Sequence, residues 1–276
     1  MDIRTPNEEE LLDCVNILLQ GFNRPVNENA IQSLGKVWQD LSKKQITKFV
    51  LVEHEGNILG TGGVTFYENV SFIGFMSILP KFQRQGVGKK IFQELLQISE
   101  KRKIKTLELF ATKAGEDLYR QFGFQLDYPA QVCEIQGKPD YKPTQDVEIS
   151  DDLPPWTIKL DKKAYGYNRA RYLKFLSERG GKVLIIENQA YGVILNNKIG
   201  PLIANNIDNA IDIIYEGIAL NCNRIIIPLH EKLEKMIFQK LNLSEIQGTK
   251  CMKMQYGSSI SGNTELIFAI NSFATG

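Results

Sequence analysis

The chain has 276 residues, of which 43% are hydrophobic and 24% are charged, and its formal net charge is +1. This length suits one large domain or two of ordinary size, and the composition is that of a chain that buries a core rather than of a disordered protein. Because the basic excess of a nucleic-acid binder is missing, we expect a small-molecule ligand and no nucleic-acid partner.

The cysteines and the N-terminal segment indicate a cytoplasmic protein without a structural metal. No two of the four cysteines stand at zinc-ligand spacing, and the chain has only two histidines. Scattered cysteines are typical of free, mostly buried thiols in a reducing compartment. Residues 1–10 are polar and acidic, unlike a secretory signal, and no apolar run is long enough to span a bilayer. We therefore expect neither a metal nor a membrane partner.

The first half of the chain alternates between helical and strand patterns. Apolar residues recur at helical spacing from Leu11 to Leu19, whereas 48–54 and 58–67 have strand composition and flank a turn signal. In chain order, the predicted elements are a strand at 3–4, helices at 7–20 and 28–41, strands at 48–54, 58–67 and 71–79, a loop at 80–88, a helix at 89–101, a strand at 106–111, a helix at 114–121 and a strand at 132–136.

Residues 137–155 contain four prolines and many charges without an apolar period, which predicts a linker. Beyond it the element order recurs. We expect a helix at 164–177, strands at 182–187, 190–195 and 199–204, a helix at 207–220, a strand at 224–228, a helix at 231–241 and a strand at 249–255. The recurrence predicts two copies of one α/β fold, at 1–140 and 156–276.

The loop at 80–88 carries the most informative chemistry. It follows a strand, contains Gly86 and Gly88, and leads directly into a helix that begins with Lys89 and Lys90. Backbone N–H groups at a helix N-terminus form an anion site, and residues without side chains let a phosphate approach the backbone. The pattern therefore predicts a site for a diphosphate, while two glycines alone are equally compatible with a simple turn.

Two other phosphate-binding motifs do not fit this loop. If the last glycine of the P-loop motif is aligned with Gly88, the motif needs a glycine in place of Gln83 and a serine or threonine in place of Lys90. A dinucleotide fingerprint that begins at Gly86 needs its third glycine where Ile91 stands. The glycines at 60–63 lie inside a predicted strand, which indicates a bulge or a close backbone approach.

The motif Gln83-x-x-Gly86-x-Gly88, after a strand and a proline and before an amphipathic helix, resembles the pyrophosphate-binding signature of the GNAT superfamily of N-acetyltransferases. Downstream, Tyr119 is followed by Gly123-Phe124, which resembles that family's second hallmark. The two motifs are separated by about one strand and one helix, as in GNAT proteins. The resemblance covers roughly residues 1–140 and implies tandem GNAT folds, each a mixed, mainly antiparallel sheet flanked by helices.

The resemblance also implies the cofactor and the site. Acetyl-coenzyme A is the expected acetyl donor, and Tyr119 is the expected general acid that protonates the leaving thiolate. The strand before the loop is expected to splay from its neighbour and bind the pantetheine arm through its backbone, and the loop is expected to hold the pyrophosphate. The strand residues are Met76, Ser77 and Ile78, and the loop residues are Gln83, Arg84, Gln85, Gly86, Val87, Gly88 and Lys89.

A general base is less visible in the sequence. Glu53, His54 and Glu108 are candidates, but each also fits a solvated or structural role, and deprotonation through water needs no dedicated base. The family pattern is broken at Thr112, where many relatives carry asparagine.

The second half lacks the loop motif and resembles the C-terminal domain of one group of two-domain GNAT proteins. Pro201 cannot donate an N–H at the corresponding junction, so we expect no coenzyme A site there. This half is expected to shape the acceptor site. Tyr165 and Arg169, four residues apart on a predicted helix face, are candidate substrate contacts, or packing residues with a surface cation.

The resemblance therefore implies an N-acetyltransferase that moves an acetyl group from acetyl-coenzyme A directly to a primary amine of a small molecule. The alternative is a non-catalytic acyl-coenzyme A sensor, which keeps the loop but acetylates no amine. A protein acceptor is a variant of the first hypothesis, and the sequence assigns no oligomeric state.

Overall fold

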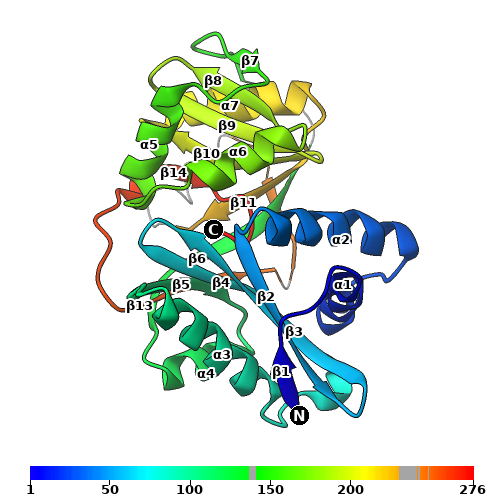
Figure 1. The fold of residues 1–276 in the computed structure, drawn as a ribbon. Helices are drawn as coiled ribbons and strands as arrows, with labels where there is room; N and C mark the ends of the chain where they lie inside the picture. Colours follow the sequence, from blue (N-terminus) through cyan, green and yellow to red (C-terminus); the bar gives the residue numbers. More distant parts are fainter. Residues whose placement is uncertain (137–140, 230–240, 242, 248) are drawn as a thin grey trace. The chain divides into compact units, whose positions relative to one another are not determined.

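The computed structural model describes residues 1–136, 141–229, 241, 243–247 and 249–276. The chain packs into two compact units, one formed by Met1–Leu109 with Thr275 and the other by Phe110–Ala274 with Gly276. Each unit contains a mixed, mainly antiparallel sheet with helices packed on it, which confirms the predicted fold class (Figure 1).

The first unit follows the predicted element order closely. Its sheet runs in the order β1-β2-β3-β4-β5, and only β4 and β5 are parallel. The elements are β1 (Asp2–Arg4), α1 (Glu10–Gly21), α2 (Glu28–Lys43), β2 (Thr47–His54), β3 (Asn57–Tyr67), β4 (Val70–Ile78), the 3-10 helix η1 (Pro80–Phe82), α3 (Val87–Lys101) and β5 (Thr106–Ala111), whose last two residues belong to the second unit.

Helices cover both faces of this first sheet (Figure 1). A Cβ atom added to Gly62 would meet Ile91 of α3, at 2.5 Å. One added to the next residue, Gly63, would meet Phe49, whose ring stacks on Trp38 of α2. Because successive strand residues point to opposite faces, α3 and α2 pack on opposite sides. The sequence predicted a bulge or a close backbone approach at these glycines, and the close approach is present at Gly60, where an added Cβ atom would lie 2.9 Å from the backbone oxygen of Ser77 in β4.

The second unit repeats the order helix, helix, three strands, helix, strand. Its sheet runs β7-β8-β9-β10-β11-β6-β13, with β10 and β11 parallel, and β12 and β14 pair with β6 and β10. The elements are α4 (Glu116–Gln121), β6 (Gln125–Ile135), β7 (Glu148–Ser150), α5 (Pro155–Tyr165), α6 (Ala170–Glu178), β8 (Lys182–Ile186), β9 (Ala190–Leu195), β10 (Lys198–Ala204), α7 (Ile207–Ala219), β11 (Arg224–Pro228), β12 (Leu243–Glu245), β13 (Cys251–Tyr256), η2 (Thr264–Leu266) and β14 (Ile267–Ala269).

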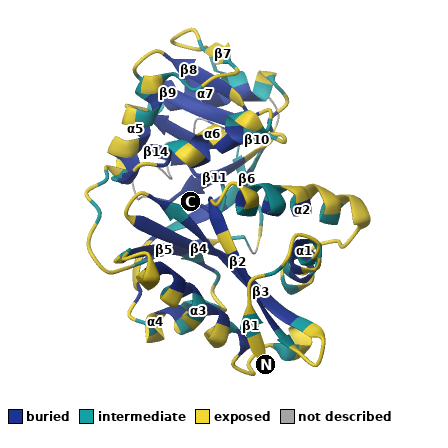
Figure 2. Cartoon of the chain, in the orientation of Figure 1, coloured by how far each residue is buried: buried dark blue, intermediate teal, exposed yellow. Residues whose placement is uncertain are grey.

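Buried aliphatic side chains hold this second sheet together. Ile199, Ile213 and Ile225 belong to one apolar cluster, in which α7 packs on β10 and β11. Figure 2 shows the strands of each unit mostly buried and the outer faces of the helices exposed. The alternation of burial along each amphipathic helix is what the sequence pattern predicts.

One predicted helix in this unit is wrong. The segment 164–177 is not continuous, because α5 ends at Tyr165 and α6 begins only at Ala170. Gly166 leaves α5 with φ at 80°, and a Cβ atom there would lie 2.7 Å from the backbone nitrogen of Gly262. Only glycine fits both the positive φ and the close approach. The helix predicted at 231–241 lies outside the described residues except for Leu241, and β12 and β14 were not predicted.

From residue 141 onward, the segment predicted as a linker packs on other parts of the second unit. β7 lies inside it and pairs with β8. The buried carboxylate of Asp212 on α7 accepts hydrogen bonds from Tyr141 Oη at 2.8 Å, from Thr144 N at 3.0 Å and from Thr144 Oγ1 at 2.6 Å. Burial and this carboxylate raise the pKa of Tyr141 to about 12. These bonds attach the segment to the helix.

Replacing Asp212 with alanine is expected to lower the free energy of unfolding by about 2–3 kcal/mol, because three donors lose an ionised acceptor. Urea denaturation followed by circular dichroism measures the change. Asp208 is exposed on the same helix, and its replacement with alanine is the control, with an expected loss of at most about 0.5 kcal/mol. Equal losses in the two variants would contradict this role for Asp212.

Strand β6 lies in the second compact unit, although it comes before the linker at which the domain boundary was predicted. Within the second unit it pairs with β11, with β12 and with β13, for example through Cys133↔Ile225 and Ala130↔Cys251. The boundary between the compact units therefore comes before β6, at Leu109. Composition does not predict which strands pair when they are distant in sequence. The division into functional domains at the linker stays a prediction.

Candidate active site

A bulge in β4 shapes the strand that leads to the predicted loop. Between its pairs with Thr61 and Gly63, β4 carries one residue more than β3. Phe75 lies in this bulge with φ at 57°, a conformation that bulky residues rarely adopt. Its ring lies 4.9 Å from that of Trp38 and 5.1 Å from that of Phe49, edge to face. This aromatic cluster holds the strained residue in its position.

Beyond the bulge, β4 separates from β5. The parallel ladder ends at the pair Ile73–Leu109, and no later residue of β4 pairs with a described residue of β5. Leu79 donates its N–H to the carbonyl of Leu59 at 3.0 Å. Because the backbone of an antiparallel strand turns alternately toward and away from its partner, Ile78 faces away from β3, on the side that β5 has left. The predicted splay of this strand is therefore present in the structure.

The three predicted strand residues present different groups. Met76 and Ile78 are half-buried, and the carbonyl of Ile78 accepts a hydrogen bond from Gln83 Nε2 at 3.2 Å. Ser77 is 4% exposed, and its Oγ donates to the carbonyl of Ile17 in α1 at 3.1 Å. The side chain of Ser77 therefore anchors α1, and the open edge consists of backbone groups on either side of it.

The loop between η1 and α3 contains a run of backbone donors without acceptors. Arg84 and Gly86 have φ values of 60° and 82°, and α3 begins at Val87, two residues earlier than predicted, without a side-chain cap. The carbonyl of Gly86 accepts the first helical bond, from Lys90 N at 3.1 Å. Within the described chain, the N–H groups of residues 84–89 donate to no acceptor. With the positive end of the helix dipole, they are an arrangement that can bind an anion.

The side chains of the loop maintain this backbone geometry. Gln83 bonds back to Ile78, and Gln85 Nε2 donates to the carbonyl of Lys81 at 2.8 Å. Val87 is 1% exposed, so only its backbone is available. A Cβ atom added to Gly86 would meet no atom within 4 Å, so the space beside the donors is open. Gly88 is half-buried and Lys89 exposed at the start of the helix.

Tyr119 lies on α4 in the second unit and is 8% exposed. Its ring packs 6.3 Å from that of Phe124. Gly123, with φ at 86°, ends the helix and lets Phe124 N–H return to the carbonyl of Tyr119 at 3.2 Å, which is the physical reason for the Tyr…Gly-Phe spacing. Burial, with a smaller contribution from nearby Cys251, raises the pKa of Tyr119 to about 12. The phenol is therefore a weaker acid than its ordinary value near 10 implies.

The candidate bases occupy three different environments. Glu53 accepts hydrogen bonds from Arg4, and His54 is exposed at the end of β2. Glu108 is 1% exposed on β5, opposite Phe72 of β4. Of the three, only Glu108 lies beside the strand that carries the open edge, and a base role for it stays a prediction.

In the second unit, the edge that corresponds to the open edge of β4 is occupied. β10 also has a bulge, at 200–201, and its parallel pairing with β11 also ends just before the bulge, at Ile199↔Ile225. Beyond that point β14 pairs with β10 through Leu202↔Ala269, and Ile270 donates its N–H to the carbonyl of Ile226 at 3.0 Å. The chain's own strand therefore fills the gap that stays open in the first unit.

The helix that follows this edge is capped as well. Asn206 precedes α7, and its side-chain oxygen accepts from Asn209 N at 2.9 Å. In α3 the corresponding donors have no side-chain cap. A capped N-terminus competes with an anion for the same N–H groups. The two features that form the candidate cofactor site in the first unit are both satisfied by protein groups in the second.

The structure places Arg169 in the interior, and not on a shared helix face with Tyr165 as predicted. Its guanidinium is fully buried and bonds to Asp161 at 2.7 and 3.1 Å and to the carbonyl of Gly276 at 3.1 Å. Tyr165 packs its ring under that guanidinium at 3.3 Å, across the helix break. Each charge of this buried pair compensates the other, so Arg169 is not the surface cation that the sequence allowed. A substrate contact of Tyr165 stays a prediction.

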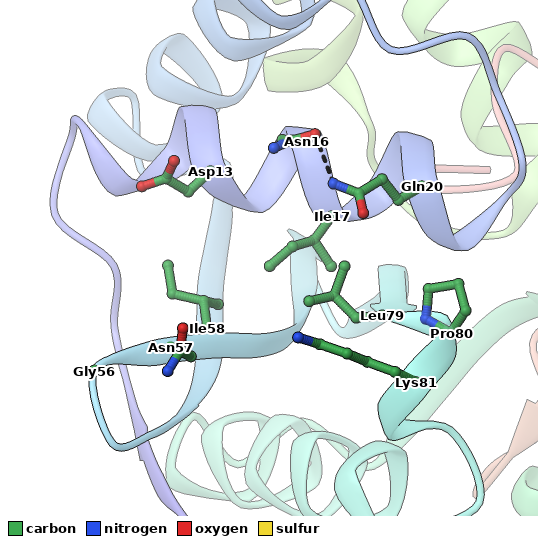
Figure 3. A pocket seen from close by; sticks show the side chains of 10 residues that line it. All are labelled: Asp13, Asn16, Ile17, Gln20, Gly56, Asn57, Ile58, Leu79, Pro80 and Lys81. Atoms are coloured by element: carbon green, nitrogen blue, oxygen red, sulfur yellow. Dashed lines mark hydrogen bonds between the residues drawn. The ribbon is translucent and has the colours of Figure 1, made fainter.

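A cleft of about 550 Å³ lies in the first unit beside the start of the loop (Figure 3). Polar residues of α1 and the β2–β3 turn line it together with apolar ones, and Figure 3 shows the Lys81 side chain extending across it. Its lining residues are Asp13, Asn16, Ile17, Gln20, Gly56, Asn57, Ile58, Leu79, Pro80 and Lys81. None of the predicted cofactor residues is among them.

The described residues show the state of the cysteines, the arrangement of possible metal ligands and the length of the helices. All four cysteines are free and buried, and burial raises the pKa of Cys14 and Cys222 to about 11. The described residues contain no group of three or more acidic, histidine or cysteine side chains arranged to hold a metal ion. None of the described helices is both long and apolar enough to cross a bilayer.

Known proteins resemble the chain in both halves. Residues 45–126 and 157–269 each match a family model described as an acetyltransferase (GNAT) domain. YitH of Bacillus subtilis, an uncharacterized N-acetyltransferase, is 27% identical over 205 residues, which are 67% of this chain and 72% of that protein.

Solved structures resemble it over nearly the whole length. An acetyltransferase structure from Pyrococcus horikoshii is 29% identical with a TM-score of 0.90, over 100% of this chain and 95% of that one. A GCN5-related N-acetyltransferase from Sphaerobacter thermophilus is 11% identical with a TM-score of 0.67, over 95% and 98% of the two chains, and it shares the fold.

Proposed function

The chain belongs to the GNAT superfamily of acetyltransferases and carries two GNAT domains in tandem, and from this premise we propose that it transfers an acetyl group from acetyl-coenzyme A directly to a primary amine of a small molecule. GNAT enzymes use acetyl-coenzyme A, and one observation carries the proposal for this chain. An open strand edge leads directly into a loop whose N–H groups, at residues 84–89, have no acceptor among the described residues.

The residues of the first unit fit the cofactor. The N–H groups of residues 84–89 bind the pyrophosphate, and the open space beside Gly86 admits it. The edge of β4 at Met76 and Ile78 offers backbone groups to the two amides of the pantetheine arm. The second unit supports this assignment, because the matching edge of β10 is paired with an extended peptide, β14, which presents the same amide groups.

The chain's residues have distinct parts in the transfer. Acetyl-coenzyme A, when bound, supplies an activated thioester. The Ile78 N–H, which faces the open side of β4, donates to the thioester oxygen as negative charge develops there. Tyr119 gives its phenolic proton to the departing thiolate, in the role that the family resemblance implies. Its raised pKa makes this transfer uphill, so the contribution depends on the position of the hydroxyl more than on its acidity.

The second domain has a different part in the proposal. Its described strand edge and helix N-terminus are filled by protein groups, so we expect it to bind no coenzyme A. We assign to it a contribution to the acceptor site, as the resemblance to two-domain GNAT proteins implies. A peptide acceptor is the variant that an acceptor screen distinguishes.

Calorimetric titration with acetyl-coenzyme A tests the proposal first. We expect one site per chain, because among the described residues the open edge and the uncapped loop occur together in the first unit, whereas the matching edge and helix of the second unit are filled and capped. An amine screen that detects released thiol then tests transfer. Two sites per chain would contradict the proposal that the second domain binds no coenzyme A. Absence of binding at millimolar acetyl-coenzyme A would contradict the cofactor assignment. Binding without turnover would indicate a sensor.

A further inference from the structure

The cleft of about 550 Å³ beside the start of the loop combines apolar side chains with two opposite charges (Figure 3). Ile17, Ile58 and Leu79 supply the apolar part, and Figure 3 shows their side chains in the space between α1 and β3. Asp13 on α1 and Lys81 on η1 are exposed and supply the charges. Pockets that hold small organic ligands measure roughly 300–1,000 Å³, so the cleft has room for one.

Neither charge is matched by an ion pair within the described chain. Asp13 accepts no hydrogen bond from a described residue, and the Lys81 ammonium lies 4.8 Å from the centre of the Phe82 ring without a described acidic partner. The two charges do not pair with each other either, although they line one cleft. Figure 3 shows one on α1 and the other reaching across from η1. A ligand that contacts both therefore needs a positive and a negative group some distance apart.

The amide side chains of the cleft are each only half used. Gln20 Nε2 donates to Asn16 Oδ1 at 2.9 Å, so the Gln20 carbonyl oxygen and the Asn16 amino group have no described partner. Asn57 Nδ2 donates to the carbonyl of Glu55 at 3.1 Å, and Asn57 Oδ1 has no described partner. The cleft therefore offers both donors and acceptors to the backbone groups of a peptide.

Charge complementarity narrows the class of ligand. A purely anionic ligand such as phosphate is repelled by Asp13, and a purely cationic one such as a polyamine is repelled by Lys81. A zwitterion is attracted by both. A short peptide with free termini also brings apolar side chains and backbone amides, which match the rest of the lining. Its termini are farther apart than the charges of a single amino acid, as two charges on different sides of a cleft require.

The walls of the cleft are hydrogen-bonded to both parts of the proposed cofactor site. The carbonyl of Lys81 accepts from Gln85 Nε2 in the loop at 2.8 Å, and the carbonyl of Ile17 accepts from Ser77 Oγ in β4 at 3.1 Å. Leu79, which lines the cleft, is the next residue after the end of β4. A ligand held between α1 and η1 restrains the elements that position the open edge and the loop, so its binding is coupled to that of the cofactor.

We propose that this cleft binds a short apolar peptide with free termini, of about dipeptide size, as an effector that tightens the binding of coenzyme A. Asp13 binds the ammonium group of the peptide, and Lys81 binds its carboxylate. The peptide site depends on the cleft alone. The effector role rests on the proposed acetyltransferase function and adds regulation to it.

Leucyl-leucine and two modified forms of it test the peptide site. Each is titrated by calorimetry into the full chain without coenzyme A, so that no acetyl transfer takes place. N-acetyl-leucyl-leucine lacks the ammonium group, and leucyl-leucinamide lacks the carboxylate. We expect one site for leucyl-leucine, and a Kd at least about threefold higher for each modified form, which corresponds to one exposed ion pair.

Charge-removing variants assign each end of the peptide to its partner. Asp13→Asn is expected to remove the difference between leucyl-leucine and its N-acetyl form and to keep the difference from the amide, while Lys81→Met is expected to do the reverse. The controls Asp2→Asn and Lys48→Met remove exposed charges elsewhere in the first unit and are expected to keep both differences. Failure of leucyl-leucine to bind, or the same pattern in Asp13→Asn and Asp2→Asn, would overturn the peptide site.

Coenzyme A tests the effector role, because it binds without acetylating the peptide. Its Kd is measured by calorimetry with and without saturating leucyl-leucine, and we expect it to be about fivefold lower with the peptide. In Lys81→Met the change is expected to fall below about twofold. An unchanged Kd in the wild-type protein would overturn the effector role. Failure to bind coenzyme A at all would instead overturn the proposed function, while the titrations without coenzyme A still decide the peptide site.

Discussion

Replacing Gly86 with glutamate is expected to abolish the binding of acetyl-coenzyme A. The new side chain would enter the open space beside the N–H groups of residues 84–89, which have no acceptor in the described part of the chain, and bring a negative charge to the proposed pyrophosphate site. One like charge at about 4 Å near a protein surface costs about 4 kcal/mol. That cost corresponds to an increase in Kd of roughly a thousandfold, which isothermal titration calorimetry measures.

Gly180 provides a matched control for this variant. It has φ at 81°, compared with 82° at Gly86, and a Cβ atom there would also meet no atom within 4 Å. Glutamate at either position costs about 1 kcal/mol of backbone strain. Gly180→Glu, in the second unit, is therefore expected to lower the melting temperature as much as Gly86→Glu while the Kd stays unchanged. Equal affinity in both variants would remove the phosphate site from this loop.

Replacing Tyr119 with phenylalanine is expected to lower kcat by about a hundredfold, the lower end of what a general acid contributes. The Kd for acetyl-coenzyme A is expected to stay within about twofold, because only a hydroxyl is lost from a buried ring. Steady-state kinetics and calorimetry give the two quantities. The control is Tyr256→Phe, which removes an exposed hydroxyl from the ring that stacks on Phe124 at 5.5 Å. Similar kcat values in the two variants would exclude the acid role.

The pH profile gives an independent check on Tyr119. A general acid is active in its protonated form, and with a pKa of about 12 Tyr119 stays protonated throughout the range in which the acceptor amine titrates. We therefore expect kcat/KM to rise with pH as the amine loses its proton and to reach a plateau, with no falling limb below about pH 11. A falling limb near pH 9, absent in Tyr119→Phe, would show that burial does not raise this pKa in the working enzyme.

The two motifs could be recognised in the sequence because each depends on the backbone conformation of a few neighbouring residues. Gly86 and Gly123 both have positive φ, and both stand at helix ends, where glycine is required or favoured. Gly86 follows Gln83 by three residues, and Gly123 follows Tyr119 by four. Spacings this short can be recognised in a single sequence. The strands and helices of the first unit were predictable for the same reason, since periodicity of apolar residues is a local signal.

Contacts between residues that are far apart in the sequence could not be predicted in this way. The sequence alone determined two α/β copies, and it predicted an anion-binding loop in the first of them and a tyrosine followed by Gly-Phe. Only the tertiary structure decided that β14 pairs with the edge of β10 in the second unit and that Asp161 and Gly276 already bind Arg169. Each of these depends on hydrogen bonds between segments far apart in the chain, whose pairing is set by packing of the whole unit rather than by local propensity.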